Sequence, residues 1–212
     1  MHATVAVTTL RGCPTSPSRA WTASAQTTRR TVAQHEYEAK FLKIDVQSTV
    51  GALRAAGAEQ VFPRMLFTRL IFENDAVQGE QWLRLRDEGG RTTLTLKQVT
   101  DATHINGTTE IEVEVDDLAK TAELLAALGL RQVRYQQNYR EEWQLSGVTY
   151  DFDTWPELDT FLEIESSSEA AVRDAVAALG LDYAHARFGS IDLIYKSELG
   201  RDILAEPTLL FA

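Results

Sequence analysis

The amino-acid sequence predicts an α+β fold, in which a sheet of about six to eight strands curls closed and amphipathic helices cover its apolar surface. Strands that alternate charged and apolar residues recur along the chain, and three helical segments follow such strands and end at glycine. The charged positions are glutamates on some strands and arginines on others. A sheet closed with these faces inward would have a wet interior, because unpaired charges are costly to bury in a dry one.

The first strand is expected at His35–Phe41, where the alternation is clearest. Glu36, Glu38 and Lys40 occupy every second position and share one face, whereas Tyr, Ala and Phe occupy the other. A charged strand face is most often the solvated side of a sheet. This strand alone therefore does not decide between a solvated face and a functional one.

The next elements are a helix, a strand and a hairpin. Residues Val46–Ala56 are expected to form a helix that ends at Gly57, which can take the left-handed conformation of a helix C-terminus. A strand is expected at Met65–Phe72. Strict alternation then predicts a hairpin formed by Trp82–Arg86 and Thr93–Lys97. The basic residues of the hairpin can share one face: Arg84, Arg86 and Lys97.

Two further units repeat the order strand, helix, strand. The expected elements of these units are, in order, Glu110–Val115, Leu118–Leu128, Val133–Trp143, Phe161–Glu165, Glu169–Leu179 and Ile191–Tyr195. Each opening strand carries a Glu-x-Glu pattern. The acids of the second unit, Glu110, Glu112 and Glu114, are equally well explained as a solvated face or as functional groups.

Composition and charge exclude several classes of protein. The net charge is -10, and the chain beyond residue 33 carries 17 basic and 31 acidic side chains. This acidic balance argues against a nucleic-acid surface, which needs a positive footprint. No stretch approaches the roughly 20 apolar residues that span a bilayer. We therefore expect a soluble, cytoplasmic protein that binds neither nucleic acid nor membrane.

Residues 1–34 differ from the rest of the chain. They are rich in Thr, Ser, Ala and Arg and lack a clear period, which predicts a disordered N-terminal tail before a folded domain at residues 35–212. An organellar transit peptide is an alternative, because the segment is rich in arginine and serine and free of acids. Translation that starts further in the chain is another.

The candidate ligands of the interior are carboxylates and cationic groups. The chain has a single cysteine, and its four histidines show no metal-ligand spacing, so a metal site would use oxygen ligands. Mg²⁺ and Mn²⁺ prefer carboxylate and water oxygens, whereas Arg and Lys suit phosphate oxygens. A polyphosphate with divalent metal would match both halves of the charged interior.

The chain resembles a known superfamily. Glu36-Tyr-Glu38-Ala-Lys40 is similar to the ExExK signature of the CYTH, or triphosphate tunnel metalloenzyme, superfamily, which includes class IV adenylate cyclases, thiamine triphosphatases and inorganic triphosphatases. Later motifs follow in the same order between residues 35 and 205: Arg84-x-Arg86, Lys97, the acidic strand Glu110 to Glu114, Arg140, Asp153 and Phe161-Leu-Glu163-Ile-Glu165. The arrangement is most similar to the class IV cyclase branch.

The resemblance implies a closed eight-stranded antiparallel β-barrel with flanking helices, open as a tunnel that holds a triphosphate. By matching position, it implies that Mg²⁺ or Mn²⁺ is held by Glu36, Glu38, Glu163 and Glu165, with Asp153 as a further metal ligand or as a group that orients the ligands. It implies that phosphate oxygens are bound by five basic residues: Lys40, Arg84, Arg86, Lys97 and Arg140. It assigns no general base. A homodimer is expected by analogy with the family.

The chain departs from the family pattern at one basic strand. Where the family usually has Lys-x-Arg, this chain has Asn138-Tyr139-Arg140, so one phosphate-binding cation is absent or is replaced by Arg134 on the same strand face. This departure weakens the assignment of the substrate more than the prediction of the fold. Arg64 and Arg69 are left unassigned, because the register of their strand is ambiguous.

Three functions follow from these observations. The first is a metal-dependent enzyme on a nucleoside triphosphate, with adenylate cyclase, which converts ATP to cyclic AMP and pyrophosphate, as the named prediction. The second is a triphosphatase that acts on thiamine triphosphate, inorganic tripolyphosphate or a nucleotide. The third is a non-catalytic binder of polyphosphate or nucleotide. Asn138 supports this third function, because it stands where the family usually has a phosphate-binding lysine.

Overall fold

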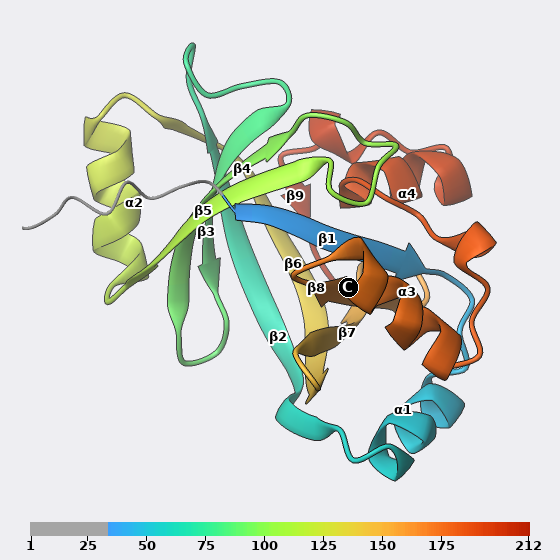
Figure 1. Ribbon diagram of the computed structural model, residues 1–212. Coiled ribbons are helices and arrows are strands. Elements are labelled where there is room, and N and C mark those ends of the chain that lie inside the picture. Colours follow the sequence, from blue (N-terminus) through green and yellow to red (C-terminus); the bar gives the residue numbers. More distant parts are fainter. Residues whose placement is uncertain (1–33) are drawn as a thin grey trace, which may run out of the picture. The chain divides into compact units, whose positions relative to one another are not determined.

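Residues 34–212 are described by a computed structural model, in which a closed barrel is surrounded by helices (Figure 1). The strands are β1 (Gln34–Phe41), β2 (Glu59–Glu73), β3 (Gln81–Asp87), β4 (Thr92–Val99), β5 (Thr108–Val115), β6 (Arg131–Leu145), β7 (Val148–Thr154), β8 (Phe161–Ser166) and β9 (Thr208–Leu209). Eight antiparallel strands follow the order β2-β3-β4-β5-β1-β8-β7-β6, and β6 pairs with β2 to close the barrel. The predicted closed eight-stranded antiparallel barrel is confirmed.

Within residues 34–212, four α-helices accompany the barrel: α1 (Val46–Ala55), α2 (Leu118–Ala127), α3 (Glu169–Ala178) and α4 (Ile191–Leu199). The first three lie within a residue or so of their predicted bounds. Each begins at a side-chain cap, because Asp45, Asp117 and Ser168 accept a hydrogen bond from a backbone N–H of the first turn. Short 3-10 helices occupy Tyr183–His185 and Ile203–Ala205.

The hydrophobic core lies between the outside of the barrel and the helices. Leu53 of α1 and Val176 of α3 belong to one buried cluster with Leu162 and Ile164 of β8. Leu125 of α2 packs in a second cluster, against β2 and β3. In Figure 1, α2 and α3 lie on different sides of the barrel. Apolar residues therefore point outward to the helices, and the alternation of each strand sends its charged residues inward.

The prediction of a strand at Ile191–Tyr195 is wrong, because these residues open helix α4. The stretch alternates, but its apolar residues also satisfy a helical spacing. Ile194 and Tyr195 are buried against Trp155 and Phe161, and Gly200 ends the helix in the left-handed conformation with φ of 65°. The third unit therefore does not end in a strand.

Two strands lie outside the predicted set. Strand β7 pairs with β6 and β8, and the two-residue strand β9 runs parallel to β6. The predicted tail falls outside the described residues, apart from Gln34, which begins β1. No helix within residues 34–212 is long and apolar enough to cross a membrane.

Candidate functional site

The strand register brings the inward charged residues of neighbouring strands opposite one another. Between β1 and β8, Glu38 faces Glu165 and Lys40 faces Glu163. On the other side of the barrel, Arg86 of β3 faces Arg69 of β2. Because side chains of the same parity share a face, the charged residues of neighbouring strands gather on the inner wall.

Two cavities follow one another along the barrel axis. The first cavity has a volume of 490 Å³ and the second 560 Å³. Five charged residues line both: Glu38, Arg84, Lys97, Arg140 and Glu163. Most strands contribute residues to the first cavity from one end and to the second from the other, as with Glu36 and Lys40 of β1, whereas β5 lines the first cavity alone. We call the two cavities together the tunnel.

Three carboxylates of the first cavity form an acidic cluster. Glu36, Glu38 and Glu165 each offer an oxygen, and these oxygens lie within 4.8 Å of one another. Lys97 Nζ lies 3.0 Å from Glu36 Oε2, although this oxygen accepts no hydrogen bond. The same ammonium lies 3.4 Å from Glu110 Oε2, which also lacks a hydrogen-bond partner. Buried carboxylate oxygens that contact an ammonium group without accepting a well-directed hydrogen bond can also bind a metal cation.

The acidic cluster holds its protons more tightly than free glutamates do. Burial raises the pKa of Glu36 and of Glu38. Burial, together with the charges of Glu36 and Glu38, raises the pKa of Glu165 to about 8. A divalent cation would favour the ionised form of all three carboxylates, because it replaces their mutual repulsion by attraction.

The other two predicted metal ligands lie in a network of ion pairs. Arg140 donates to Asp153 Oδ1 and Oδ2 at 2.8 and 2.6 Å, to Asp151 Oδ2 at 2.6 Å and to Glu163 Oε1 at 3.2 Å. Lys40 Nζ lies 3.0 Å from Glu163 Oε2 and 2.5 Å from Glu38 Oε1. Despite burial, Lys40 and Arg140 lower the pKa of Glu163. Asp153 and Glu163 are therefore placed to position cationic side chains, beside the cluster of three.

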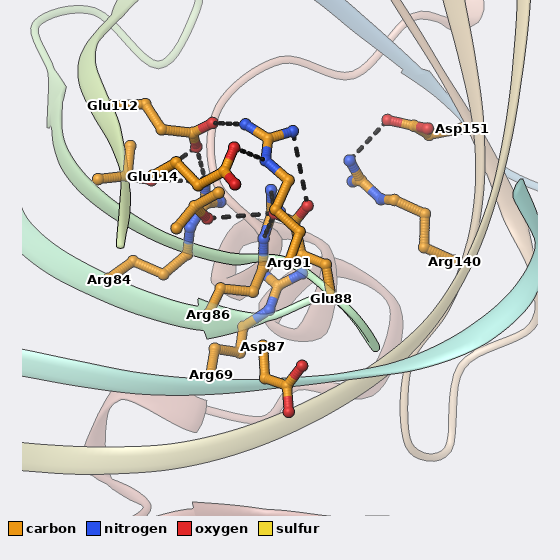
Figure 2. A network of polar contacts seen from close by, with 12 residues as sticks. Arg69, Arg84, Arg86, Asp87, Glu88, Arg91, Glu112, Glu114, Arg140 and Asp151 are labelled. Carbon is orange, nitrogen blue, oxygen red and sulfur yellow. Dashed lines mark hydrogen bonds and ion pairs between the residues drawn. The ribbon is translucent and has the colours of Figure 1, made fainter. Parts of the chain in front are cut away.

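The opposite wall is basic. Arg84 and Arg86 are buried side chains of β3, and they lie close to the acids of the tunnel rim (Figure 2). Arg86 pairs with Glu88 at 2.5 Å, and Arg84 lies 3.5 Å from Glu112. Burial and the charges of Arg84 and Arg140 lower the pKa of Arg86 to about 10. This wall therefore carries positive charge that its own acids balance only in part.

Asn138 and Arg134 occupy different positions on β6. Asn138 is fully buried and donates to Asp153 Oδ1 at 3.0 Å. Arg134 lines the second cavity, but its guanidinium pairs with Glu73 and donates to the carbonyl oxygen of Leu204 at 3.1 Å. The charge of Arg134 is thus balanced by a neighbouring acid.

Comparison with models of protein families assigns the chain to one family. The model of the CYTH domain matches residues 34–189, which is most of the chain and includes all eight strands of the barrel. The chain belongs to the CYTH domain family. A search of curated protein sequences gives no match.

Solved structures share the fold of this CYTH domain. The PH1012 protein of Pyrococcus horikoshii is 24% identical with a TM-score of 0.60, covering 72% of this chain and 94% of its own. A conserved hypothetical protein of Pyrococcus furiosus is 23% identical with a TM-score of 0.62, covering 74% and 97%. A Vibrio parahaemolyticus protein described as "a putative adenylate cyclase" is 12% identical with a TM-score of 0.65, covering 78% and 99%. At these identities the likeness establishes the fold.

Several residues of the tunnel were not assigned from the sequence. Arg69 faces the interior, and bulges of β2 between Gln60 and Met65 explain why its register was ambiguous. Asp151 lies on the missed strand β7, where alternating Val, Tyr and Phe would have revealed it. Of the three acids left open on β5, Glu110 and Glu112 line the first cavity.

Proposed function

We propose that this CYTH-family protein is a metal-dependent enzyme that acts on the triphosphate group of a nucleotide or another organic triphosphate. The observation that carries the proposal is the tunnel itself, in which the acidic cluster of Glu36, Glu38 and Glu165 shares the first cavity with Arg84 and Arg86. Carboxylates gathered beside guanidinium groups match a polyphosphate that arrives with divalent metal.

The residues present fit Mg²⁺ or Mn²⁺. The acidic cluster supplies oxygen ligands only, and one oxygen of Glu36 lacks a hydrogen bond although it is buried. Glu36, Glu38 and Glu165 would hold the ion, and Glu163 lies beside them in an ion pair with Lys40. When bound, the ion would neutralise phosphate charge and polarise a phosphoryl oxygen.

The protein's own groups would bind and orient the triphosphate. Arg84, Lys97 and Arg140 line both cavities, so they can contact successive phosphates along the tunnel. Phosphoryl transfer depends mainly on positioning and on stabilisation of charge at the phosphate oxygens. Fixed guanidinium groups provide both, because the strands of a closed barrel hold them rigidly.

The second cavity supports an organic triphosphate as substrate. Its wall includes Trp82, Phe161 and Leu193 in addition to charged residues, whereas the first cavity is lined mainly by charged groups. Apolar and aromatic walls suit an organic group attached to the phosphate chain. Adenylate cyclase is our named candidate. The ribose 3′ hydroxyl loses its proton and its oxygen attacks the α-phosphorus, the bond from the α-phosphorus to the oxygen that bridges to the β-phosphorus breaks, and pyrophosphate leaves with that oxygen.

Product identification tests the proposal. The full chain is incubated with ATP, thiamine triphosphate or tripolyphosphate in the presence of Mg²⁺ or Mn²⁺, and the products are separated by chromatography. We expect cyclic AMP and pyrophosphate from ATP. Release of orthophosphate instead would identify a triphosphatase, and saturable binding without turnover would identify a binding protein. An absence of both binding and turnover with all three compounds would overturn the proposal.

A further inference from the structure

Arg69 of β2 is a buried cation without a carboxylate partner. Its side chain is 8% exposed, and within residues 34–212 it forms no ion pair. Its Nη2 donates to Asn138 Oδ1 at 2.7 Å, and its guanidinium carbon lies 4.4 Å from the centre of the Trp155 ring. Its Nε has no hydrogen-bond partner. A buried guanidinium normally pairs with an acid, so this environment needs an explanation.

The neighbours of Arg69 increase its excess of positive charge. Arg84 and Arg86 lie on the adjacent strand, and Figure 2 shows the three side chains grouped together. Burial and repulsion from Arg84 and Arg86 lower the pKa of Arg69 well below its ordinary value. Asp153 attracts Arg69, but both oxygens of Asp153 already accept hydrogen bonds from Arg140.

The position of Arg69 distinguishes it from the basic residues already considered. It lines the second cavity and not the first, whereas Arg84 lines both. Arg134 also lines the second cavity, but Glu73 balances its charge. Arg69 is therefore an unbalanced cation that lies between the charged residues that line both cavities and the apolar part of the second cavity.

We propose that Arg69 is a substrate-binding residue, and that it contacts the phosphate next to the organic group of the triphosphate. This inference rests on the proposed function, because it places the organic group in the second cavity. A phosphate oxygen would supply the acceptor that Nε lacks and would relieve the repulsion among the three arginines. The hydrogen bond to Asn138 and the contact with Trp155 hold the guanidinium in place before the anion binds.

The test measures the binding of ATP and of tripolyphosphate by calorimetry, in EDTA so that neither turnover nor metal contributes. Arg69→Met is expected to weaken the binding of both compounds about 10- to 100-fold, which is the range for one charge-assisted hydrogen bond. Arg64→Met is the matched control, because Arg64 lies on the same strand but is exposed and lines neither cavity. We expect its affinities to stay within twofold of the wild type.

Thermal unfolding separates substrate binding from a structural role. Without ligand, Arg69→Met should be at least as stable as the wild type, because the change removes an unbalanced buried charge and keeps its apolar volume. The rise in Tm on addition of tripolyphosphate should shrink. A lower Tm without ligand, combined with an unchanged affinity, would show a structural role and overturn the inference.

Two further variants keep the inference testable. If Arg69→Met does not fold, Arg69→Lys keeps the charge, and we expect it to bind both compounds less tightly than the wild type, because it loses the planar guanidinium. In Arg69→Met/Asn138→Lys, an ammonium from β6 would reach the place that the guanidinium occupied, and binding should recover in part. Affinity within twofold of the wild type in Arg69→Met, or in Arg69→Lys if Arg69→Met does not fold, would overturn the inference. Failure of the wild type to bind either compound in EDTA, and again in the presence of Mg²⁺, would instead overturn the proposed function.

Discussion

The two walls of the tunnel differ in how their charges are balanced. On β1, β7 and β8, buried acids surround Lys40 and Arg140, and each of these cations contacts more than one carboxylate. On β2 and β3, Arg69, Arg84 and Arg86 are crowded together with few acids. Without a ligand, the charges of the acidic wall are largely balanced, except at the cluster that is suited to metal. The charges of the basic wall are not balanced. This difference favours an anionic ligand that brings its own cations.

The largest expected effect is the loss of the metal ligands. In the double variant Glu36→Gln/Glu38→Gln, metal-dependent turnover of the triphosphate substrate should fall below detection, because two of the three clustered carboxylates lose their charge. The fold should persist, since burial already favours the neutral form of both groups. Product assays and circular dichroism would measure the two properties. Turnover that survives in a folded double variant would show that the cluster is not the metal site.

Removal of the central cation of the acidic wall should destabilise the protein. Arg140→Met leaves Asp151, Asp153 and Glu163 without their shared partner, which we expect to cost about 3–5 kcal/mol of unfolding free energy. Urea unfolding of the metal-free protein would measure the change. The control is Arg173→Met, which removes an exposed pair with Glu169 on α3 and should cost less than about 1 kcal/mol. Equal stability of the two variants would contradict the contrast between the walls.

The acidic cluster should make stability depend on pH. The folded protein keeps the proton of Glu165 up to its pKa of about 8, whereas the unfolded chain releases it near the ordinary glutamate pKa of 4.5. Stability should therefore fall between pH 5 and 8 in EDTA, by roughly 1–3 kcal/mol. Glu165→Gln should flatten this part of the profile. Mn²⁺ should raise Tm more at pH 8 than at pH 6, because the metal binds the ionised carboxylates.

The smallest effect is expected at the rim of the tunnel. Glu114 lies 3.3 Å from Arg91, and both side chains are exposed. Glu114→Gln should change the unfolding free energy by less than about 0.5 kcal/mol, because a surface ion pair contributes little. Glu112→Gln, on the same face of β5, should have the larger effect, since Glu112 also accepts from buried Thr95 at 2.8 Å. Chemical unfolding of the two variants compares them directly.

Sequence patterns predicted the barrel best where the alternation was strict. The hairpin of β3 and β4 placed Arg84, Arg86 and Lys97 on one face, as the register shows. The prediction failed at Ile191–Tyr195, because a short apolar stretch fits both periods and contacts with Trp155 and Phe161 favour the helix.

The candidate site was predicted less completely than the fold. The order of charged motifs indicated which residues face inward, but not which acids pair with cations and which remain free to bind metal. That distinction depends on contacts between distant strands, such as Arg140 with Glu163. Arg69 was missed because both faces of β2 carry apolar residues and its bulges interrupt the count.

The region shared with the family ends before the second cavity is complete. The match to the family ends at residue 189, whereas Ser190, Leu193, Ile203 and Leu204 form part of the wall of that cavity. The barrel that matches the family model therefore supplies most of the charged residues of both cavities, and the stretch after residue 189 adds part of the apolar wall of the second cavity. If the proposed function holds, substitutions in α4 and the segment after it would change selectivity for the organic group while the charged residues of the barrel stay the same.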